Sequence, residues 1–506
     1  MTQHTEIERK YDVDGGTEIV IEDVAGPHGP IVADEPHTSR LVADYVDTPT
    51  LALAAHGITL RRREGGQDAG WHLKLPAAKG ARREVHEPLS AGVHQVPARL
   101  SKLVAARVRG RELVHVATVE TNRTTRRLRD RDGEVVAEVA DDLVAGRRLT
   151  QDPPESVSWR EVEVELVNGS GKLFKALDPV LREAGAVPAD GSSKLARLLG
   201  EDLAPPHRHT AVRTAGDVLV SYLDEQRDRL LTYDPLVRLA DHDDDSVHKM
   251  RVAVRRTRSL LRTHGRLLDK DRAAALDTEL KWLADRLGEV RDLEVLAARF
   301  DRRLTDHPVG PGRDAGWLDQ LAGREREARK SLRRAMTTPR YFALLTALDD
   351  FIAAPPFTGR ARRKARRQSS RLVVKSWRKA LDKYAKAERL PEGAERDRAL
   401  HSTRKAAKRA RYTAEAAAPA LGKPAAKVAE RAEGLQEELG RYQDSVVAQQ
   451  QLTEIAGWPG LSTGDTFSLG YLLGGERGEA ADARRDLVRA RKHAAKTRAH
   501  LRALKK

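Results

Sequence analysis

Acidic residues recur at every second position in two short stretches of the first 200 residues. The stretch TEIERKY carries Glu6, Glu8 and Lys10 in this spacing. Successive side chains of an extended strand point to opposite faces, so these three residues would share one face of a strand. By itself this stretch is typical of a solvated edge strand, but like charges repeated along one face cost free energy unless a cation lies between them. The stretch WREVEVEL repeats the arrangement with three glutamates: Glu161, Glu163 and Glu165.

Basic residues lie in phase on the strand-like stretches between these two ends. Taken singly, each is typical of a solvated strand face, but together they indicate a charged interior. Carboxylate oxygens are the ligands that Mg²⁺ and Mn²⁺ prefer, and basic side chains bind phosphate oxygens. We therefore predict a cavity for divalent cations and a polyphosphate. The stretches LRRR, WHLKLP, RREVHEP, TNRTTRR and AEVADD contribute Arg61, Arg63, Lys74, Arg82, Glu84, Arg123, Glu138 and Asp142.

The fold class of the first 200 residues follows from short strands separated by Gly, Pro and Asp clusters, with helix near residues 101–108 and 173–184. This pattern predicts an antiparallel barrel or sandwich. If the apolar residues between the charges pack outward against helices or loops, the charged face must line an interior, which favours a barrel. No Walker-type glycine loop and no Ser, His, Asp or Cys nucleophile arrangement is apparent, so water is the expected phosphoryl acceptor.

Composition bounds the class of protein. The chain has 506 residues, enough for several domains, and no cysteine, which excludes disulfides and thiolate metal sites. No apolar run approaches the roughly 18 residues that span a membrane, and no signal peptide is evident, so we expect a soluble cytoplasmic protein. The net charge of +16 divides into roughly −3 before residue 200 and roughly +19 after it. The second part therefore needs a polyanion, and the aromatic content of 4% argues against single-stranded nucleic acid.

A duplicated helical unit follows a predicted linker over residues 201–212, which contains Pro205 and Pro206. The sequence VHKMRVAVRRTR recurs as LHSTRKAAKRAR, and LGEVRD recurs as LGRYQD at nearly the same offset. Matched motifs at one offset indicate an internal repeat. We predict two bundles of about four helices each, over residues 213–355 and 360–506.

Basic residues form one stripe on a helix of each repeat. Positions i, i+3, i+7 and i+10 fall on one helix face, where like charges are unfavourable until an extended anion neutralises them. A solvated face is the alternative, but its duplication favours anion binding. The run RARRKARRQSSR would extend this basic surface. The stripes comprise His248, Arg251, Arg255 and Arg258 in the first copy and His401, Arg404, Lys408 and Arg411 in the second.

The motifs of residues 1–200 resemble those of the CYTH family, the triphosphate tunnel metalloenzymes. The opening Glu-x-Glu-x-Lys is followed, in the family's order, by YVDT, LRRR, LKLP, EVEVEL and SSKLARLL. The resemblance implies an eight-stranded antiparallel barrel whose tunnel binds a triphosphate, with Glu6, Glu8 and Lys10 in catalytic roles. It implies that Glu6, Glu8, Glu163 and Glu165, helped by Glu161 and Asp142, hold Mg²⁺ or Mn²⁺, and that Lys10, Arg61, Arg63, Lys74, Arg82, Arg123 and Lys194 hold phosphates.

The repeat over residues 213–506 resembles the CHAD family, the conserved-histidine α-helical domains. This resemblance rests on the histidine followed by bases at the third and seventh places, and it implies two pseudo-symmetric bundles whose basic face binds inorganic polyphosphate. Lys408 stands where the first copy has Arg255. Lysine also binds phosphate but lacks the bidentate geometry of arginine.

Together these features predict an α+β multidomain protein that hydrolyses inorganic triphosphate in a metal-dependent reaction and binds polyphosphate through an all-α domain. The alternatives are a class IV type adenylate cyclase, hydrolysis of thiamine triphosphate or a nucleoside triphosphate, a non-catalytic polyphosphate receptor, and nucleic-acid binding by the helical half. Partners would be triphosphate and polyphosphate, with no membrane and no particular protein indicated. We expect a cytoplasmic location, with association to polyphosphate granules.

Overall fold

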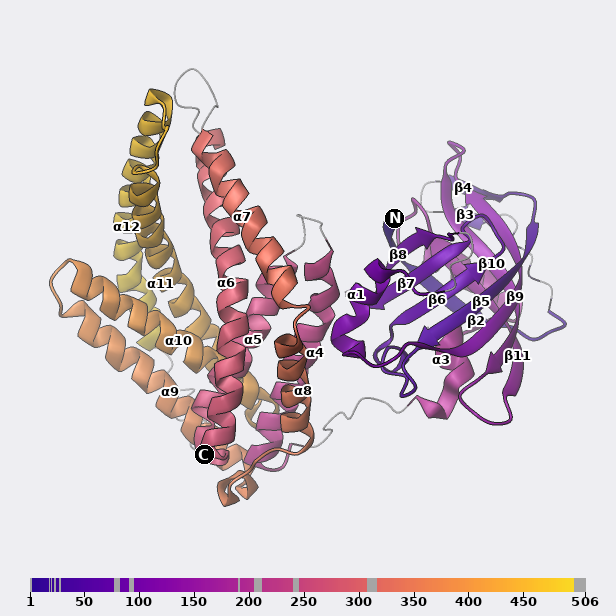
Figure 1. Ribbon diagram of the computed structural model, residues 1–506, viewed down its shortest axis with the longest axis horizontal. Helices are drawn as coiled ribbons and strands as arrows, with labels where there is room; N and C mark the ends of the chain where they lie inside the picture. Colours follow the sequence, from indigo (N-terminus) through magenta and orange to yellow (C-terminus); the bar gives the residue numbers. More distant parts are fainter. Residues whose placement is uncertain are drawn as a thin grey trace. The chain divides into compact units, whose positions relative to one another are not determined.

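The computed structural model describes residues 2–17, 19, 21, 24–26, 29–76, 82–90, 95–189, 192–203, 212–239, 245–306 and 316–495, with backbone alone for residues 2–6, 25–26, 201 and 488–495. It divides into two compact units, Met1–His207 and Arg208–Lys506 (Figure 1). Most of the predicted linker lies outside the described residues, and the predicted domain limits stay predictions. Within the described part of the chain, no helix combines the length and the apolar character needed to cross a membrane.

The first unit is one antiparallel sheet flanked by short helices, which confirms the predicted fold class. Two small strands, β3 (Val24–Gly26) and β4 (Gly29–Ala33), pair with each other, and β4 also pairs with β9. The order of neighbouring strands is β1 (Thr2–Glu6), β8 (Arg82–Pro88), β7 (Gly70–Pro76), β6 (Thr59–Glu64), β5 (His37–Asp47), β9 (Val114–Arg129), β10 (Val135–Arg148), β11 (Glu155–Leu166), β2 (Glu8–Asp12) and β12 (Val187–Pro188).

The N-terminal stretch borders both ends of this sheet. We expected one strand through TEIERKY, but it is interrupted at Ile7, so that β1 pairs with β8 while β2 pairs with β11. Ile7 is exposed, and its carbonyl accepts a hydrogen bond from the Leu166 backbone N–H at 3.0 Å. The break lets one continuous segment join the two ends of a curled sheet. If β1 and β2 are counted as one strand, they and the seven strands β5–β11 make the predicted eight strands. In the described residues, β3, β4 and β12 are additional.

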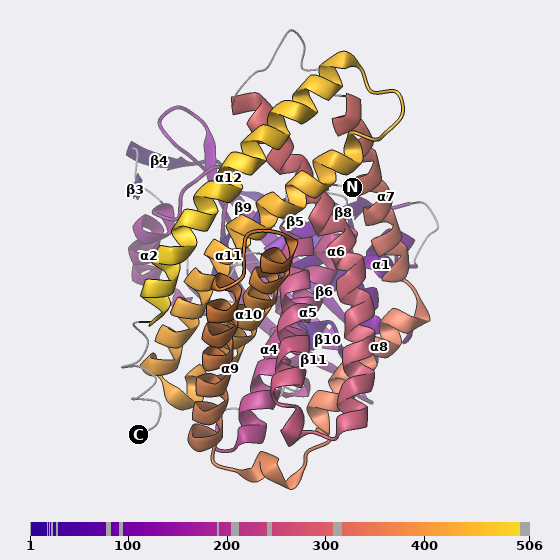
Figure 2. The ribbon, with the colours of Figure 1, turned by 90° about the vertical axis from the view of Figure 1, so that its left-hand side faces the viewer.

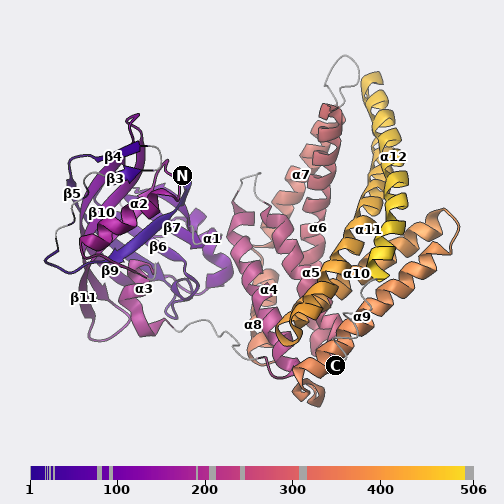
Figure 3. The same ribbon diagram turned by 180° about the vertical axis from the view of Figure 1, so that it is seen from behind.

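Apolar residues of β2, β10 and β11 face outward and are covered by helix α2 (Leu173–Glu183). Tyr11, Val139 and Val162 are buried in one cluster with Leu177 of α2. Figure 3 shows α2 lying against the outer face of the sheet. Because side chains alternate along a strand, this burial directs the neighbouring charged residues to the inner face.

Helix α3 (Lys194–Leu199) fills one end of the barrel. Leu195 and Leu198 belong to one apolar cluster with Tyr45 and Val144 of the sheet. A Cβ at Gly146 of β10 would lie 2.8 Å from Leu198 Cδ1, so the close approach of strand and helix requires glycine there. The other helix of the first unit, α1 (Ala98–Val108), buries Leu100 and Leu103. The packing of α3 places its first residue, a lysine, at the barrel interior.

The second unit is all helical and shows the predicted duplication. In the first half α4, α5, α6 and α7 pack consecutively, as α9, α10, α11 and α12 do in the second. Helix α5 contacts α10, and this contact joins the two halves of the unit (Figure 2). Among the described residues, α8 adds a fifth helix to the first half of this unit. The bounds are α4 Ala215–Arg238, α5 Ser246–Thr263, α6 Lys270–Asp306, α7 Gly316–Ala335, α8 Pro339–Ala353, α9 Ala365–Glu388, α10 Ala394–Leu421, α11 Lys423–Ile455 and α12 Thr463–Ala495.

The burial of α2 against the sheet generates a stability prediction. Leu177→Ala should destabilise the first unit by about 2 to 5 kcal/mol, because it leaves a cavity at a fully buried position. Leu143→Ala is the matched control, since Leu143 is 53% exposed and should shift the free energy of unfolding by less than about 0.5 kcal/mol. Hydrogen exchange of barrel peptides in increasing urea measures both effects, and equal destabilisation would contradict the packing.

Candidate functional site

Charged residues meet in cross-strand rows on the inner face of four neighbouring strands. One row crosses the four strands β9, β10, β11 and β2. In it Arg123 pairs opposite Asp142, Asp142 opposite Glu161, and Glu161 opposite Asp12. Directly opposed residues of antiparallel strands project to the same face. The next two rows therefore follow on the same face, one containing Glu163 and Lys10 and the other containing Glu138, Glu165 and Glu8.

These rows form one wall of an interior cavity of about 140 Å³. The cavity brings together all the residues predicted to hold phosphate and three of those predicted to hold metal. The side chain of Glu6 lies outside the described residues, but its backbone pairs opposite Arg82. The charged lining comprises Glu8, Lys10, Arg61, Arg63, Asp68, Lys74, Arg82, Glu84, Arg123, Glu138, Glu163, Glu165 and Lys194.

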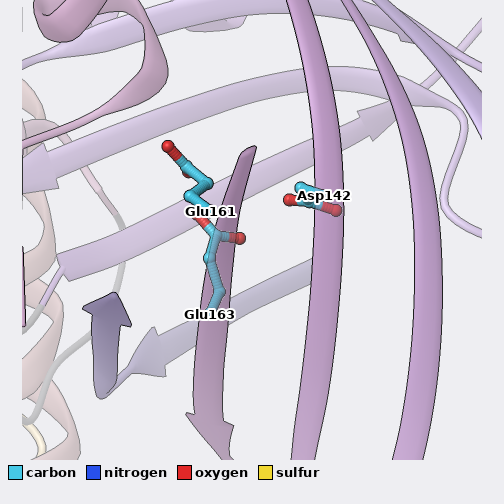
Figure 4. Close-up of side chains that lie close together, drawn as sticks. All are labelled: Asp142, Glu161 and Glu163. Carbon is cyan, nitrogen blue, oxygen red and sulfur yellow. The ribbon is translucent and has the colours of Figure 1, made fainter. Parts of the chain in front are cut away.

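Three carboxylates form a cluster in this wall: Asp142 on β10 with Glu161 and Glu163 on β11 (Figure 4). One oxygen from each lies within 4.8 Å of the others. The Lys194 Nζ lies 2.9 Å from Asp142, 2.7 Å from Glu161 and 2.8 Å from Glu163. Its ammonium group thus stands among three carboxylates, where a metal cation would be equally well placed.

Ion pairs keep Asp142 and Glu163 of this cluster ionised despite their burial. Burial by itself raises the pKa of Glu163, but Lys10, Lys194 and Arg123 together hold that pKa well below its ordinary value. Arg123 donates to both oxygens of Asp142, at 2.8 and 2.7 Å, and to Glu163 at 2.7 Å. Charged carboxylate oxygens at these separations fit a hard divalent cation. Asp142, Glu161 and Glu163 would hold it. Of these three, Glu163 lines the cavity, together with Glu8 and Glu165.

Positive charge is in excess at the opposite wall. Arg63 is only 6% exposed, and burial together with Arg61 and Arg123 lowers its pKa to about 9. Arg63 pairs with Asp68, and Arg61 donates to the Tyr45 hydroxyl at 3.3 Å. A buried guanidinium group whose pKa is lowered by burial and by neighbouring guanidinium groups indicates a site prepared for an anion.

A histidine of this wall was missed by our sequence reasoning. His72 is buried, with Nδ1 2.6 Å from Glu84 Oε1 and Nε2 2.9 Å from the Asp68 carbonyl oxygen. Burial lowers the pKa of His72 to about 4. Its position in the strand could have revealed it. His72 is two residues from Lys74 on β7, and residues two apart on a strand share one face, so His72 faces the interior with Lys74.

The cavity opens into a wider polar mouth. This mouth shares Arg63, Asp68 and Arg123 with the cavity, and has a volume of about 670 Å³. Its other lining residues include His37 and Arg127. The cavity is therefore connected to a wider polar opening on this side, while α3 packs against the inner face of the sheet elsewhere.

Four basic residues of the two repeats gather where α5 packs against α10: Arg251 and Arg255 from α5, and Arg404 and Lys408 from α10. Burial and the charges of Arg255, Arg404 and Arg251 lower the pKa of Lys408 to about 7. Two carboxylates offset this charge in part. Asp292 lies 2.8 Å from Arg251 and Asp444 lies 3.3 Å from Arg404.

The other members of the predicted stripes have different surroundings. Burial lowers the pKa of His248 and of His401, assisted by neighbouring bases such as Arg251 and Lys405. Arg258 bonds to Asp277 at 3.0 Å, and Arg411 bonds to Glu415 and Glu433 at 2.7 Å each. Carboxylates thus offset Arg258 and Arg411, and the excess charge is concentrated in the central four.

The pH dependence of stability tests the environment of Lys408. In the unfolded chain the lysine keeps its proton up to its ordinary pKa, whereas the folded unit loses the proton above about pH 7. The unfavourable charge is therefore fully present below about pH 7 and fades as pH rises toward about 10. We expect Lys408→Gln to raise the melting temperature of the helical unit at about pH 6, and to raise it much less at about pH 9.5.

Calorimetry of the intact chain measures this effect. Lys405→Gln is the matched control, because Lys405 is exposed on the same helix. An equal gain for Lys408→Gln at both pH values would show that its charge is not the cause.

Comparison with known proteins identifies both units. The CYTH domain model matches residues 4–198, and the CHAD domain model matches residues 221–453. Uncharacterized protein Rv2226 of Mycobacterium tuberculosis is 36% identical over 506 residues, covering 96% of this chain and 95% of that protein.

Solved structures show more distant likeness. PptA from Streptomyces chartreusis is 24% identical, with a TM-score of 0.47 over 54% of this chain and 98% of that chain. The CHAD domain from the plant Ricinus communis is 25% identical, with a TM-score of 0.45 over 59% of this chain and 96% of that chain. From the two matched domains and the full-length relative, this chain belongs to the family of proteins that join a CYTH domain to a CHAD domain.

Proposed function

We propose that this chain hydrolyses inorganic triphosphate to phosphate and diphosphate in a metal-dependent reaction, and that its helical domain binds polyphosphate. The observation that carries the enzymatic part is the enclosed cavity in which an ionised carboxylate cluster adjoins an excess of buried basic side chains. Phosphoryl transfer needs alignment and charge neutralisation more than a covalent nucleophile, and this lining supplies both. Family membership supports a tunnel enzyme without choosing its substrate.

The basic residues would orient the substrate. Lys10, Arg61, Arg63, Lys74, Arg82, Arg123 and Lys194 surround the cavity and would bind the phosphate oxygens. A Mg²⁺ or Mn²⁺ ion at the carboxylate cluster would supply charge neutralisation at the phosphates. Lys194 and Lys10 now neutralise these carboxylates, so their ammonium groups would be released toward phosphate oxygens when metal and substrate bind.

Water would attack the terminal phosphorus, the bridging P–O bond would break, and diphosphate would leave. We assign the acceptance of the water's one proton to a carboxylate of the N-terminal strand, either Glu6 or Glu8. Glu8 lines the cavity, and one of its oxygens lies 3.6 Å from the Lys10 Nζ. Lys10 would offset the charge that develops on the transferred group.

The polar lining favours an inorganic substrate. Tyr45 is the one aromatic side chain among the residues that line the described cavity, and its hydroxyl is engaged by Arg61. Recognition of a nucleobase or a thiamine ring usually uses an apolar or aromatic surface. This observation favours inorganic triphosphate over ATP, thiamine triphosphate or a cyclase substrate.

In the helical domain, the four central basic residues support polyphosphate binding. Burial and the repulsion from the other three bases lower the pKa of Lys408, and an extended anion would offset that repulsion. The same chemistry would then serve both domains, because triphosphate and longer polyphosphate present the same oxygens.

Glu163→Gln should abolish most metal-dependent turnover of triphosphate, by about a hundredfold or more, because it removes a charge shared by Lys10, Lys194 and Arg123 and a metal ligand. Phosphate release would be measured from inorganic triphosphate, ATP and thiamine triphosphate with Mg²⁺ or Mn²⁺. Glu120→Gln is the matched control, since Glu120 lies on β9 with its side chain 50% exposed and paired with Arg40.

We expect the intact chain and Glu120→Gln to prefer triphosphate over the two organic substrates. Melting temperatures would show that Glu163→Gln remains folded. If the intact chain turns over none of the three substrates with either metal, the enzymatic proposal is wrong and a binding protein remains.

Polyphosphate should displace a labelled polyphosphate from the intact chain far better than DNA or RNA of equal charge, by about tenfold or more at equal salt. Arg255→Gln should weaken this binding, because Arg255 belongs to the central cluster. Arg286→Gln, on the solvent-exposed side of α6, is the control. Equal displacement by nucleic acid would instead support nucleic-acid binding.

A further inference from the structure

One repeated motif of the helical domain has no role in the function described so far. It reads Leu-Gly-x-x-x-Asp and occurs once on α6 and once on α11. The leucines, Leu287 and Leu439, are buried in the bundle. Core packing therefore explains the leucines but leaves the glycine and the aspartate unexplained.

In each repeat the glycine lies beneath an arginine of the neighbouring helix. A Cβ at Gly288 would lie 3.6 Å from Arg251 Nη2 and 3.9 Å from Arg251 Cζ. A Cβ at Gly440 would lie 3.1 Å from Arg404 Nη2 and 3.4 Å from Arg404 Nε. Both glycines are buried, and these arginines supply the nearest atoms within 4 Å. Each guanidinium group thus lies on the helix backbone in space that a larger side chain would fill.

The aspartate holds the same guanidinium group at its edge. Residues four apart on a helix lie on one face, so the aspartate stands about one turn beyond the glycine. Asp292 bonds to Arg251 Nη1 at 2.8 Å, and Asp444 lies 3.3 Å from Arg404 Nη1. The two repeats therefore make the same arrangement from different surrounding residues.

The residue before the aspartate turns toward the histidine of the same repeat. Gln443 hydrogen-bonds to His401, and Arg291 is among the charges that lower the pKa of His248. The motif on one helix thus meets both the histidine and the first arginine of the basic stripe on its neighbour. The motif therefore contacts residues of the basic stripe without belonging to the stripe, as expected of residues that position others.

We propose that the Leu-Gly-x-x-x-Asp motif is an arginine seat, a pair of positioning residues that fixes Arg251 and Arg404 in the orientation used to bind polyphosphate. This inference rests on the proposed binding of polyphosphate by the helical domain. An arginine held in place before binding loses less side-chain entropy when the anion arrives. The seats therefore hold two of the four central bases, Arg251 and Arg404, one in each repeat.

Gly440→Leu tests the seat in the intact chain, with polyphosphate of defined length as the probe. Leucine has a higher helix propensity than glycine, so the helix itself should not be weakened. We expect binding to weaken by about fivefold or more, as Arg404 is displaced, without a lower melting temperature. Gly434→Leu is the matched control, because Gly434 is exposed on the same helix with no other atom within 4 Å of its added Cβ.

A double-mutant cycle with Arg404→Ala separates positioning from a structural effect. If the glycine acts through the arginine, Gly440→Leu should weaken binding in the intact chain and change nothing when Arg404 is already alanine. If Gly440→Leu does not fold, Gly440→Ala is compared with Gly288→Ala. The tighter contact at 3.1 Å should then weaken binding, and the ordinary contact at 3.6 Å should not.

Two results would overturn the seat while the proposed function stands: binding by Gly440→Leu equal to that of Gly434→Leu, or losses that add fully with Arg404→Ala. If the intact chain binds no polyphosphate at all, the proposed function of the helical domain fails first, before any variant is compared.

Discussion

The repulsion between buried like charges is the constraint on which both domains depend. In the barrel, burial and neighbouring guanidinium groups lower the pKa of Arg63 to about 9, and in the helical domain the same causes lower that of Lys408 to about 7. A folded protein tolerates such positions when other interactions supply the necessary free energy, and an anion relieves them. In each domain, therefore, a bound anion would relieve an unfavourable arrangement of the domain's own side chains.

Strand alternation makes this arrangement possible in the barrel. The apolar residues of β2, β10 and β11 are buried under α2 on the outer face, so the charged residues between them are forced inward. There the acids of β2, β10 and β11 lie on adjacent strands, with Lys10 and Arg123 in their rows, and the other strands of the lining contribute Arg61, Arg63, Lys74 and Arg82. The burial of Val162 and Val164 on the outer face thus directs Glu163 to the inner face. The same alternation of apolar and charged residues therefore stabilises the fold and places the candidate site.

This pattern explains how much could be predicted from the sequence. Period-two alternation was sufficient to find the inward residues, including Arg82 and Glu138, because burial specifies the register of a strand. The break at Ile7 was not predictable, since it follows from the need of one segment to pair at both ends of the sheet. The contact of His72 with Glu84 likewise depends on the register between β7 and β8, which no local signal reveals.

The difference between the two repeats follows from the same constraint. Arg255 and Lys408 are equivalent positions, and Arg255 is the charged group that acts most strongly on Lys408. A guanidinium group keeps its charge at neutral pH, so two arginines facing one another would repel permanently in the absence of an anion. A lysine can release its proton instead. This one difference among the eight stripe residues thus gives the unliganded domain a way to lower its charge. Binding of an extended anion would make protonation of Lys408 favourable and restore that charge.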